Sequence, residues 1–172
     1  KKWYQCGLID GITTNPTLLT KASITNPRDH LTAIITMMPS ADISIEVTET
    51  DPMLMYKQAH AIAALGSNVV VKIPCHQVYY EVIHRLIKDG IRLNITLVFS
   101  LGQGLLMSKL GVTYISPFVG RLEEHDEDGI VLLDQLRTCI DRYGYKTQIL
   151  AASLRSVEHV YGAWCTSVDA VT

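Results

Sequence analysis

The sequence lacks the marks of a membrane, metal or redox protein. No stretch approaches the roughly 18 consecutive apolar residues of a membrane span, and the first residues lack the apolar core of a signal peptide. The four cysteines form no Cys-x-x-Cys pair, and the six histidines form no His-Glu-x-x-His motif. We therefore expect a cytoplasmic protein without a metal ion.

An excess of charge of one sign is also missing. The formal net charge is −2, and the lysines and arginines do not gather into a basic stripe with aromatic residues between them. We therefore expect neither nucleic acid nor a membrane as a partner. The only Gly-x-Gly is Gly102-Gln103-Gly104, and Met107 stands where a dinucleotide-binding fingerprint has its third glycine. Any phosphate recognised here should be a small one, held by arginines and backbone amides.

What the sequence does contain is a regular alternation of strand and helix signals over 172 residues. The patterns predict strands at 11–15, 42–47, 69–74, 93–98, 112–118, 147–153 and 168–172, and helices at 26–38, 51–65, 77–88, 100–110, after the acidic segment 123–128 as far as 143, and at 157–161. This alternation favours one domain with a parallel sheet. The sheet is either open and doubly wound or a (β/α)₈ barrel, although barrels typically need about 250 residues.

The positions of polar residues favour the barrel. Polar side chains alternate near the carboxyl ends of several predicted strands, and alternate residues of a strand point to the same face. These residues are Thr13 and Asn15, Ser44 and Glu46, Asn94 and Thr96, and Ser153 leading to Arg155. In a barrel they converge at the top of the interior, where barrel active sites lie. Taken singly, each is more often a turn former or a satisfied polar group.

Lys72 is the most unusual residue in this pattern. It lies in the β-branched run 69–74, which predicts a strand buried on both faces and ended by Pro74. Burial disfavours the ammonium form of a lysine and leaves an amine that can attack a carbonyl. The alternative is a lysine that reaches water or pairs with a carboxylate. Glu46 lies between two apolar residues and must itself be paired or protonated if it is buried.

Five segments resemble, in order, motifs of the transaldolase family. They are 11–19 (GITTNPTLL), 70–74 (VVKIP), 94–100 (NITLVFS), 116–121 (SPFVGR) and 150–155 (LAASLR). The resemblance covers nearly the whole chain, and five motifs in the family's order are specific where any one alone would be weak. It implies a (β/α)₈ TIM barrel of the class I aldolase type that needs no cofactor.

The resemblance also implies roles for individual residues. Lys72 matches the lysine that forms a Schiff base, Glu46 the glutamate that acts as acid and base through a water, and Thr96 the threonine that helps to hold this water. The implied substrate-binding residues are Thr13, Asn15, Asn94, Ser116 and Phe118 in the donor pocket and Arg121, Ser153 and Arg155 around the phosphate. Arginine suits a phosphate dianion because its guanidinium donates two parallel hydrogen bonds.

The implied activity is that of a transaldolase. Such an enzyme transfers a three-carbon dihydroxyacetone unit from sedoheptulose 7-phosphate or fructose 6-phosphate to glyceraldehyde 3-phosphate or erythrose 4-phosphate, in the pentose phosphate pathway. Two alternatives stay open: a fructose-6-phosphate aldolase, which releases free dihydroxyacetone, and a noncatalytic sugar-phosphate-binding protein. The aldolases tend to have glutamine at the position of Glu46 and tyrosine at that of Phe118, so both positions favour the transferase.

The two ends of the sequence depart from the family. The family's first strand carries a catalytic aspartate, and Lys1 stands after the place of that strand; we do not assign this role to Asp10. The sequence ends within the eighth strand, before the terminal helices with which short family members build pentamers and decamers. We expect residues 1–172 to form a single barrel domain without the first strand and the C-terminal helices, and by resemblance we expect a homo-oligomer.

Overall fold

Seven parallel strands form the centre of the protein in the computed structural model, which describes residues 2–172. The strands are β1 (Gly11–Thr13), β2 (Asp42–Glu46), β3 (Val69–Pro74), β4 (Leu93–Val98), β5 (Tyr114–Pro117), β6 (Gln148–Ala151) and β7 (Ala170–Val171). Their order in the sheet is their order in the sequence. Every neighbouring pair is therefore joined by a helical crossover, as the alternation of signals predicts.

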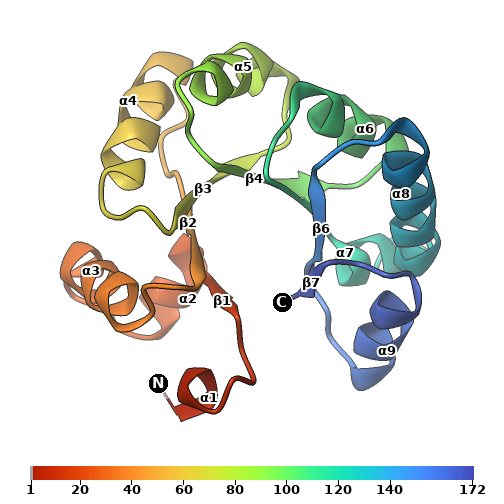
Figure 1. The fold of residues 1–172 in the computed structure, drawn as a ribbon, viewed down its shortest axis with the longest axis horizontal. Coiled ribbons are helices and arrows are strands. Elements are labelled where there is room, and N and C mark those ends of the chain that lie inside the picture. The colour runs from red at the N-terminus through yellow and green to blue at the C-terminus, as the bar shows by residue number, and fades with distance from the viewer. Residues whose placement is uncertain (1) are drawn as a thin grey trace.

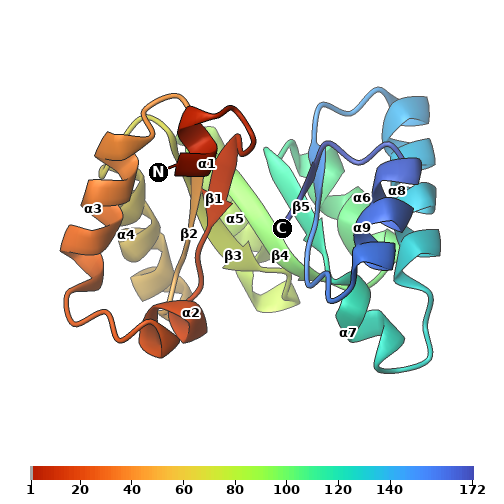
Figure 2. The ribbon, with the colours of Figure 1, turned by 90° about the horizontal axis from the view of Figure 1, so that it is seen from below.

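The longer helices lie on the outer side of the curled sheet (Figure 1). The helices are α1 (Lys2–Gln5), α2 (Pro16–Lys21), α3 (Pro27–Met37), α4 (Pro52–Ala63), the 3₁₀ turn η1 (Gln77–Tyr79), α5 (Tyr80–Lys88), α6 (Leu101–Leu110), α7 (Val119–Glu123), α8 (Gly129–Tyr143) and α9 (Val157–Cys165). Figure 2 shows α2 and α7 at the same end of the molecule, because each follows the carboxyl end of a strand. The residues predicted to form the site belong to this end.

The sheet curls into a partial barrel. Figure 1 shows β1 and β7 on the two sides of its opening. Within residues 2–172, β1 pairs only with β2 and β7 only with β6. The two edges nevertheless meet at one point, where the hydroxyl oxygens of Thr13 and Thr172 are 2.7 Å apart. A cavity of about 590 Å³ between the edges is lined by residues of both strands.

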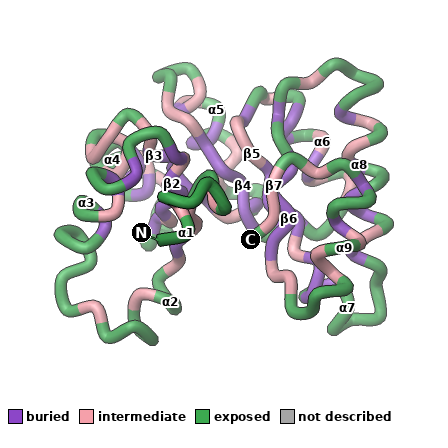
Figure 3. The backbone as a smooth tube through the Cα atoms, turned by 60° about the horizontal axis from the view of Figure 1, so that its bottom comes forward, coloured by how far each residue is buried: buried purple, intermediate pink, exposed green. Residues whose placement is uncertain are grey.

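Apolar side chains fill the space between the sheet and the helices. One cluster combines Ile73 of β3 and Ile95 of β4 with Leu136 of α8, and a smaller one joins Ile43 of β2 to Leu31 of α3. Figure 3 shows the buried residues along the strands and the exposed ones on the outer turns of the helices. Apolar side chains at the outward positions of the strands pack against the helices. The alternate inward positions are therefore available to polar side chains.

Polar residues at the helix starts explain where several helices begin. Asn26 accepts a hydrogen bond from the backbone N–H of Asp29, and Pro27 takes the first position of α3. Asp51 and Asp128 each accept from two backbone N–H groups in the first turns of α4 and α8. A cap of this kind stabilises a helix by about 1 kcal/mol. These helices begin where the sequence predicts.

Other elements differ from the predictions. The first strand was expected to reach Asn15, but Asn15 caps α2: its side-chain oxygen accepts from the N–H of Leu18 over 2.8 Å, and Pro16 begins the helix. Neither α1, α2 nor α7 was expected, since helices of four to six residues show too little apolar periodicity. The strands β5, β6 and β7 are shorter than predicted, and α9 is longer.

A charged network crosses the interior near the amino ends of β2, β4 and β5. Arg92 donates to both carboxylate oxygens of Asp42, and the Tyr114 hydroxyl donates to the same carboxylate over 2.7 Å. Burial alone would raise the pKa of the Asp42 carboxyl, but the hydrogen bonds from Arg92 and Tyr114 outweigh it and lower this pKa. Burial and the bond to Asp42 raise the pKa of Tyr114 to about 12. The network therefore ties three strands together.

Replacing Tyr114 with phenylalanine should lower the free energy of unfolding by about 1 kcal/mol near neutral pH, because the bond to Asp42 is lost. The folded-state pKa of Tyr114, about 12, lies above the ordinary value of 10.0. The contribution of this hydroxyl is therefore complete below about pH 10 and is lost as the pH rises toward 12. Denaturant unfolding of both proteins across this range measures the difference.

The matched control is Tyr143→Phe, which makes the same change at an exposed tyrosine. This control should keep the stability of the wild type at every pH. Equal stability of Tyr114→Phe and the wild type near neutral pH would contradict the assignment of the network as stabilising.

Candidate active site

Lys72 and Glu46 form a buried ion pair near the carboxyl ends of β3 and β2. The two residues are partners in the register of these strands, so their side chains lie side by side on the inner face. Lys72 Nζ lies 3.0 Å from Glu46 Oε2 and also donates to the backbone carbonyl of Thr14 over 3.4 Å. The side chains of Lys72 and Glu46 are only 9% and 18% exposed. Each charge thus supplies the partner that burial of the other requires.

A row of buried polar side chains continues from this pair. Asn94 of β4 is the register partner of Lys72. Its Nδ2 donates to Ser44 Oγ over 3.1 Å, and its Oδ1 accepts from Ser116 Oγ over 2.7 Å. All three side chains are buried. The amide of Asn94 is therefore held at both ends, and the inward positions of β2, β4 and β5 carry the polar set that the sequence predicts.

Thr96 lies further toward the carboxyl end of β4 and has an unusual environment. It is 1% exposed, and its hydroxyl has no hydrogen-bond partner among the described residues. Leu97 follows with a φ of +57°, in the left-handed region, and the register with β5 shifts there. A non-glycine residue in this region costs about 1–3 kcal/mol and is typical of functional sites. Backbone strain at Leu97 and a hydroxyl without a partner among the described residues thus occur at adjacent positions.

Thr13 and Asn15 lie at the end of β1, where their polar groups have other partners. The Thr13 hydroxyl meets that of Thr172, and the Asn15 side chain caps α2. Asn15 and Glu46 also line one cavity of about 490 Å³, whose other walls come from α2, α3 and α4. Asn15 therefore shares a cavity with Glu46, but the contact seen for its side chain is the helix cap.

Arg121, Ser153 and Arg155 come together where α7 approaches the end of β6. Gly120 permits this approach: its N–H donates to the Ser153 carbonyl over 3.1 Å, and a Cβ at this position would lie 2.4 Å from that oxygen. Ser153 has a φ of +59°, in the left-handed region. Both arginines form ion pairs with Glu124, that of Arg121 over 3.7 Å. The structure thus pairs the two predicted phosphate-binding arginines with one carboxylate, and Ser153 lies beside Gly120 of α7.

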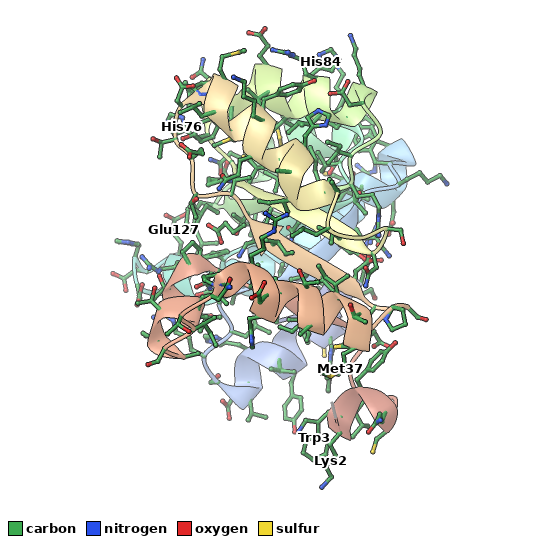
Figure 4. All side chains as sticks on the ribbon, turned by 90° about the vertical axis from the view of Figure 1, so that its left-hand side faces the viewer. Lys2, Trp3, Met37, His76, His84 and Glu127 are labelled. Atoms are coloured by element: carbon green, nitrogen blue, oxygen red, sulfur yellow. The ribbon has the colours of Figure 1, made fainter. Side chains whose placement is uncertain are left out.

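Aromatic side chains contribute to the same end of the molecule. The ring of Phe118 packs edge-on against that of Phe99, with centroids 6.0 Å apart. Figure 4 labels His76, which follows β3, and Glu127, which follows α7, along one edge of the molecule, with Met37 and Trp3 toward the opposite edge. The candidate site lies at the edge marked by His76 and Glu127, where the strands end.

Two residues that contact the site have no assigned role in the sequence prediction, although Ser44 belongs to its converging polar set. Ser44 accepts from Asn94, and its alternation with Glu46 on one strand was the available signal. Glu124 lies in the acidic segment 123–128, where the charges indicated a solvated loop. No pattern in the sequence connects Glu124 with Arg155, which follows 31 positions later.

The whole sequence, residues 1–172, matches the family model described as Transaldolase/Fructose-6-phosphate aldolase. This chain belongs to the transaldolase/fructose-6-phosphate aldolase family. It is 41% identical over 172 residues to a probable transaldolase of Dehalococcoides mccartyi, a match that covers 100% of this chain and 80% of the relative. It is 44% identical over 174 residues to a probable transaldolase of Lactiplantibacillus plantarum, with 100% and 78% covered. The family predicted from the five motifs is therefore confirmed.

Solved structures show the fold of this transaldolase-family chain in more distant proteins. A mutant flavocytochrome b2 with pyruvate bound gives a TM-score of 0.66 at 14% identity, and the match covers 86% of this chain and 45% of that one. The flavin-binding domain of baker's yeast flavocytochrome b2 gives 0.64 at 14% identity, with 81% and 44% covered. The chain thus spans less than half the length of these proteins, and at this identity the likeness concerns the fold alone.

Membrane spans and clusters of metal ligands are absent from the part of this chain that the structure describes. Every helix in residues 2–172 is too short or too polar to span a lipid bilayer. The same residues hold no group of three or more histidine, cysteine, aspartate or glutamate side chains suited to a metal ion. The candidate active site itself offers amine, carboxylate, amide, hydroxyl and guanidinium groups.

Replacing Thr96 with valine should leave the free energy of unfolding within about 0.5 kcal/mol of the wild type, because the lost hydroxyl has no partner among residues 2–172. Turnover should nevertheless fall about tenfold or more if this hydroxyl serves a substrate or a water. Denaturant unfolding and steady-state kinetics on the same protein samples measure both effects.

Thr147→Val is the matched control. Thr147 is also buried, but its hydroxyl donates to the Val112 carbonyl over 2.7 Å. This variant should lose about 1–2 kcal/mol of stability and keep its turnover. The prediction for Thr96 fails if Thr96→Val is as destabilised as Thr147→Val and turns over like the wild type.

Proposed function

We propose that this chain has transaldolase activity and works through a Schiff base on Lys72. It would transfer a dihydroxyacetone unit from a ketose phosphate, such as sedoheptulose 7-phosphate or fructose 6-phosphate, to an aldose phosphate, such as glyceraldehyde 3-phosphate or erythrose 4-phosphate. The observation that carries the proposal is the 3.0 Å approach of the Lys72 amine to the Glu46 carboxylate in a buried polar site. Membership of the family and the probable transaldolases among the relatives support it.

The ion pair suits the first step of this chemistry. Lys72 gives a proton to Glu46 and attacks the ketose carbonyl carbon as a free amine. Glu46, acting through a water held by Thr96, then returns a proton to the carbinolamine hydroxyl, which leaves as water. The product is an iminium between Lys72 Nζ and the former carbonyl carbon.

The iminium draws electrons from the neighbouring carbon–carbon bond. Removal of the C4 hydroxyl proton, which we assign to Glu46 acting through its water, breaks the C3–C4 bond and releases an aldose phosphate. The bonding electrons remain as a three-carbon enamine on Lys72. This enamine attacks the aldehyde carbon of the acceptor, and water then hydrolyses the new iminium to free the product ketose and Lys72. A covalent intermediate of this kind predicts ping-pong kinetics.

The remaining site residues suit substrate binding. Asn94 is the register partner of Lys72, and Ser116 bonds to Asn94. We assign their amide and hydroxyl groups to the donor's hydroxyls, together with Thr13 and Asn15 at the end of β1. Arg121, Ser153 and Arg155 are proposed to bind the phosphate group. A ketose phosphate carries its carbonyl and its phosphate at opposite ends of a carbon chain, and it therefore needs two separate sets of binding residues.

Glu46 and Phe118 favour transfer over release of dihydroxyacetone. A carboxylate can accept a proton from a water and return it in each half-reaction, whereas an amide at this position cannot. A phenylalanine at position 118 has no hydroxyl to supply this proton instead. Release of free dihydroxyacetone would instead indicate an aldolase, the second activity of the family.

Coarser features of the proposal concern the whole protein. We propose a single domain of the (β/α)₈ barrel class, supported by the seven parallel strands in sequence order. The pentose phosphate pathway, a cytoplasmic location and a pentamer or decamer stay predictions from the family resemblance.

Incubation with fructose 6-phosphate followed by borohydride reduction should trap a three-carbon adduct on Lys72, because borohydride converts the iminium to a stable secondary amine. Peptide mass spectrometry locates the adduct. Lys72→Met should give no adduct and no turnover, whereas Lys109→Met, at an exposed helical lysine, should behave like the wild type.

An absent adduct on wild-type protein shown to be folded would overturn the Schiff-base proposal and leave the noncatalytic binding protein. If the adduct forms, reactions with and without an aldose phosphate acceptor distinguish the transaldolase from the aldolase. Product ketose formed only with an aldose phosphate present indicates the transferase, and dihydroxyacetone accumulating without an acceptor indicates the aldolase.

A further inference from the structure

Glu124 occupies the position between the two arginines assigned to the phosphate. Its Oε1 accepts from Arg155 Nη1, and its Oε2 lies 3.7 Å from Arg121 Nε. Glu124 comes directly after α7, where its backbone N–H bonds to the Gly120 carbonyl. The three side chains are about half exposed, so an anion from solvent can reach the arginines. The carboxylate therefore holds the guanidinium groups that a phosphate would need.

The carboxylate of Glu124 is held as an anion. The hydrogen bond from Arg155 lowers the pKa of the Glu124 carboxyl; desolvation opposes this, and the positive charges of Arg155 and Arg121 add to the lowering. Glu124 consequently stays ionised throughout the neutral range. A carboxylate and a phosphate use the same donor geometry of a guanidinium, and two anions at this site repel one another.

The neighbouring carboxylate has a different partner. Glu123 Oε2 lies 2.6 Å from His159 Nε2, and His159 Nδ1 accepts from the backbone N–H of Arg155 over 3.2 Å. Glu123 and His159 thus hold the backbone of Arg155 in place without using its guanidinium. The position of Arg155 therefore does not depend on Glu124 alone. If Glu124 is displaced, the Arg155 guanidinium stays available to bind a phosphate.

We propose that Glu124 acts as an internal competitor that sets the anion selectivity of the phosphate subsite. Its carboxylate occupies the arginine pair in the free protein and is displaced by a substrate phosphate. A monoanion gains little over the carboxylate that it replaces, whereas a phosphate dianion carries twice its charge and has three oxygens for the two arginines. This inference deepens the proposed function, because it assumes that Arg121 and Arg155 bind the phosphate.

Binding of inorganic phosphate, measured by isothermal titration calorimetry on the wild type and Glu124→Gln, tests the proposal. Glu124→Gln should bind phosphate about three- to tenfold more tightly, since the competing charge is gone while a side chain of the same size remains. The control Glu127→Gln makes the same change at an exposed residue three positions away, which Figure 4 labels. This control should stay within about twofold of the wild type, as expected for a change of net charge alone.

A double-mutant cycle separates competition from a purely structural role. In an Arg155→Gln background, the gain from Glu124→Gln should largely disappear, because the guanidinium for which the two anions compete is missing. Unchanged or weaker phosphate binding by Glu124→Gln, with the protein folded by circular dichroism, would overturn the proposal. A gain of the same size in Glu127→Gln, or in the Arg155→Gln background, would also overturn it.

The outcome is distinguishable from failure of the proposed function. Phosphate binding needs no turnover, so a tighter Glu124→Gln alongside a missing adduct on Lys72 would support the competitor role and reject the transaldolase. An adduct on Lys72 together with unchanged phosphate binding by Glu124→Gln would reject the competitor role alone. In an active enzyme, the KM of Glu124→Gln for a phosphorylated donor should fall by a similar factor.

Discussion

The ion pair between Lys72 and Glu46 depends on the parallel register of β2 and β3, and the rest of the site is arranged around it. Taking a charge out of water costs several kcal/mol, which only a well-placed partner offsets. Register pairing on one face of the sheet supplies this partner within 3.0 Å. Helices packed on the outer face bury the strands, and Asn94 continues the polar row on the next strand. A shift of one residue in register would place the two charges on opposite faces.

The interior of the partial barrel contains two polar regions with different properties. Near the amino ends, Asp42, Arg92 and Tyr114 satisfy one another and tie three strands together. Near the carboxyl ends, the polar groups include the buried amine of Lys72 and the hydroxyl of Thr96, which has no partner among residues 2–172. A network whose members are satisfied stabilises the fold, whereas an incompletely satisfied one is available to a ligand. This difference places the candidate chemistry at the carboxyl ends, where other barrel enzymes have theirs.

Much of the fold was predictable because its signals are local. The β-branched run 69–74 predicts its strand, and the Asn26-Pro27 start predicts α3, since each signal lies within a few residues. The short helices α2 and α7 escaped prediction because they hold too few residues for a periodic pattern. Asn15 was mispredicted for this reason. The sequence predicts it as a strand residue that points into the site, but in the structure it caps α2 and accepts a hydrogen bond from the N–H of Leu18. Strand ends were the least predictable feature, since pairing with neighbours decides where a strand stops.

The sequence by itself determined which residues alternate on each strand, so that Ser44 shares a face with Glu46 and Asn94 shares one with Thr96. The family followed from five ordered motifs, because such motifs are written in consecutive residues. Only the tertiary structure decided that Thr96 has no partner and that Glu124 lies between the two arginines. Such contacts join residues from different elements, and their distances depend on how strands and helices pack. The pattern of neighbouring residues in the sequence does not determine that packing.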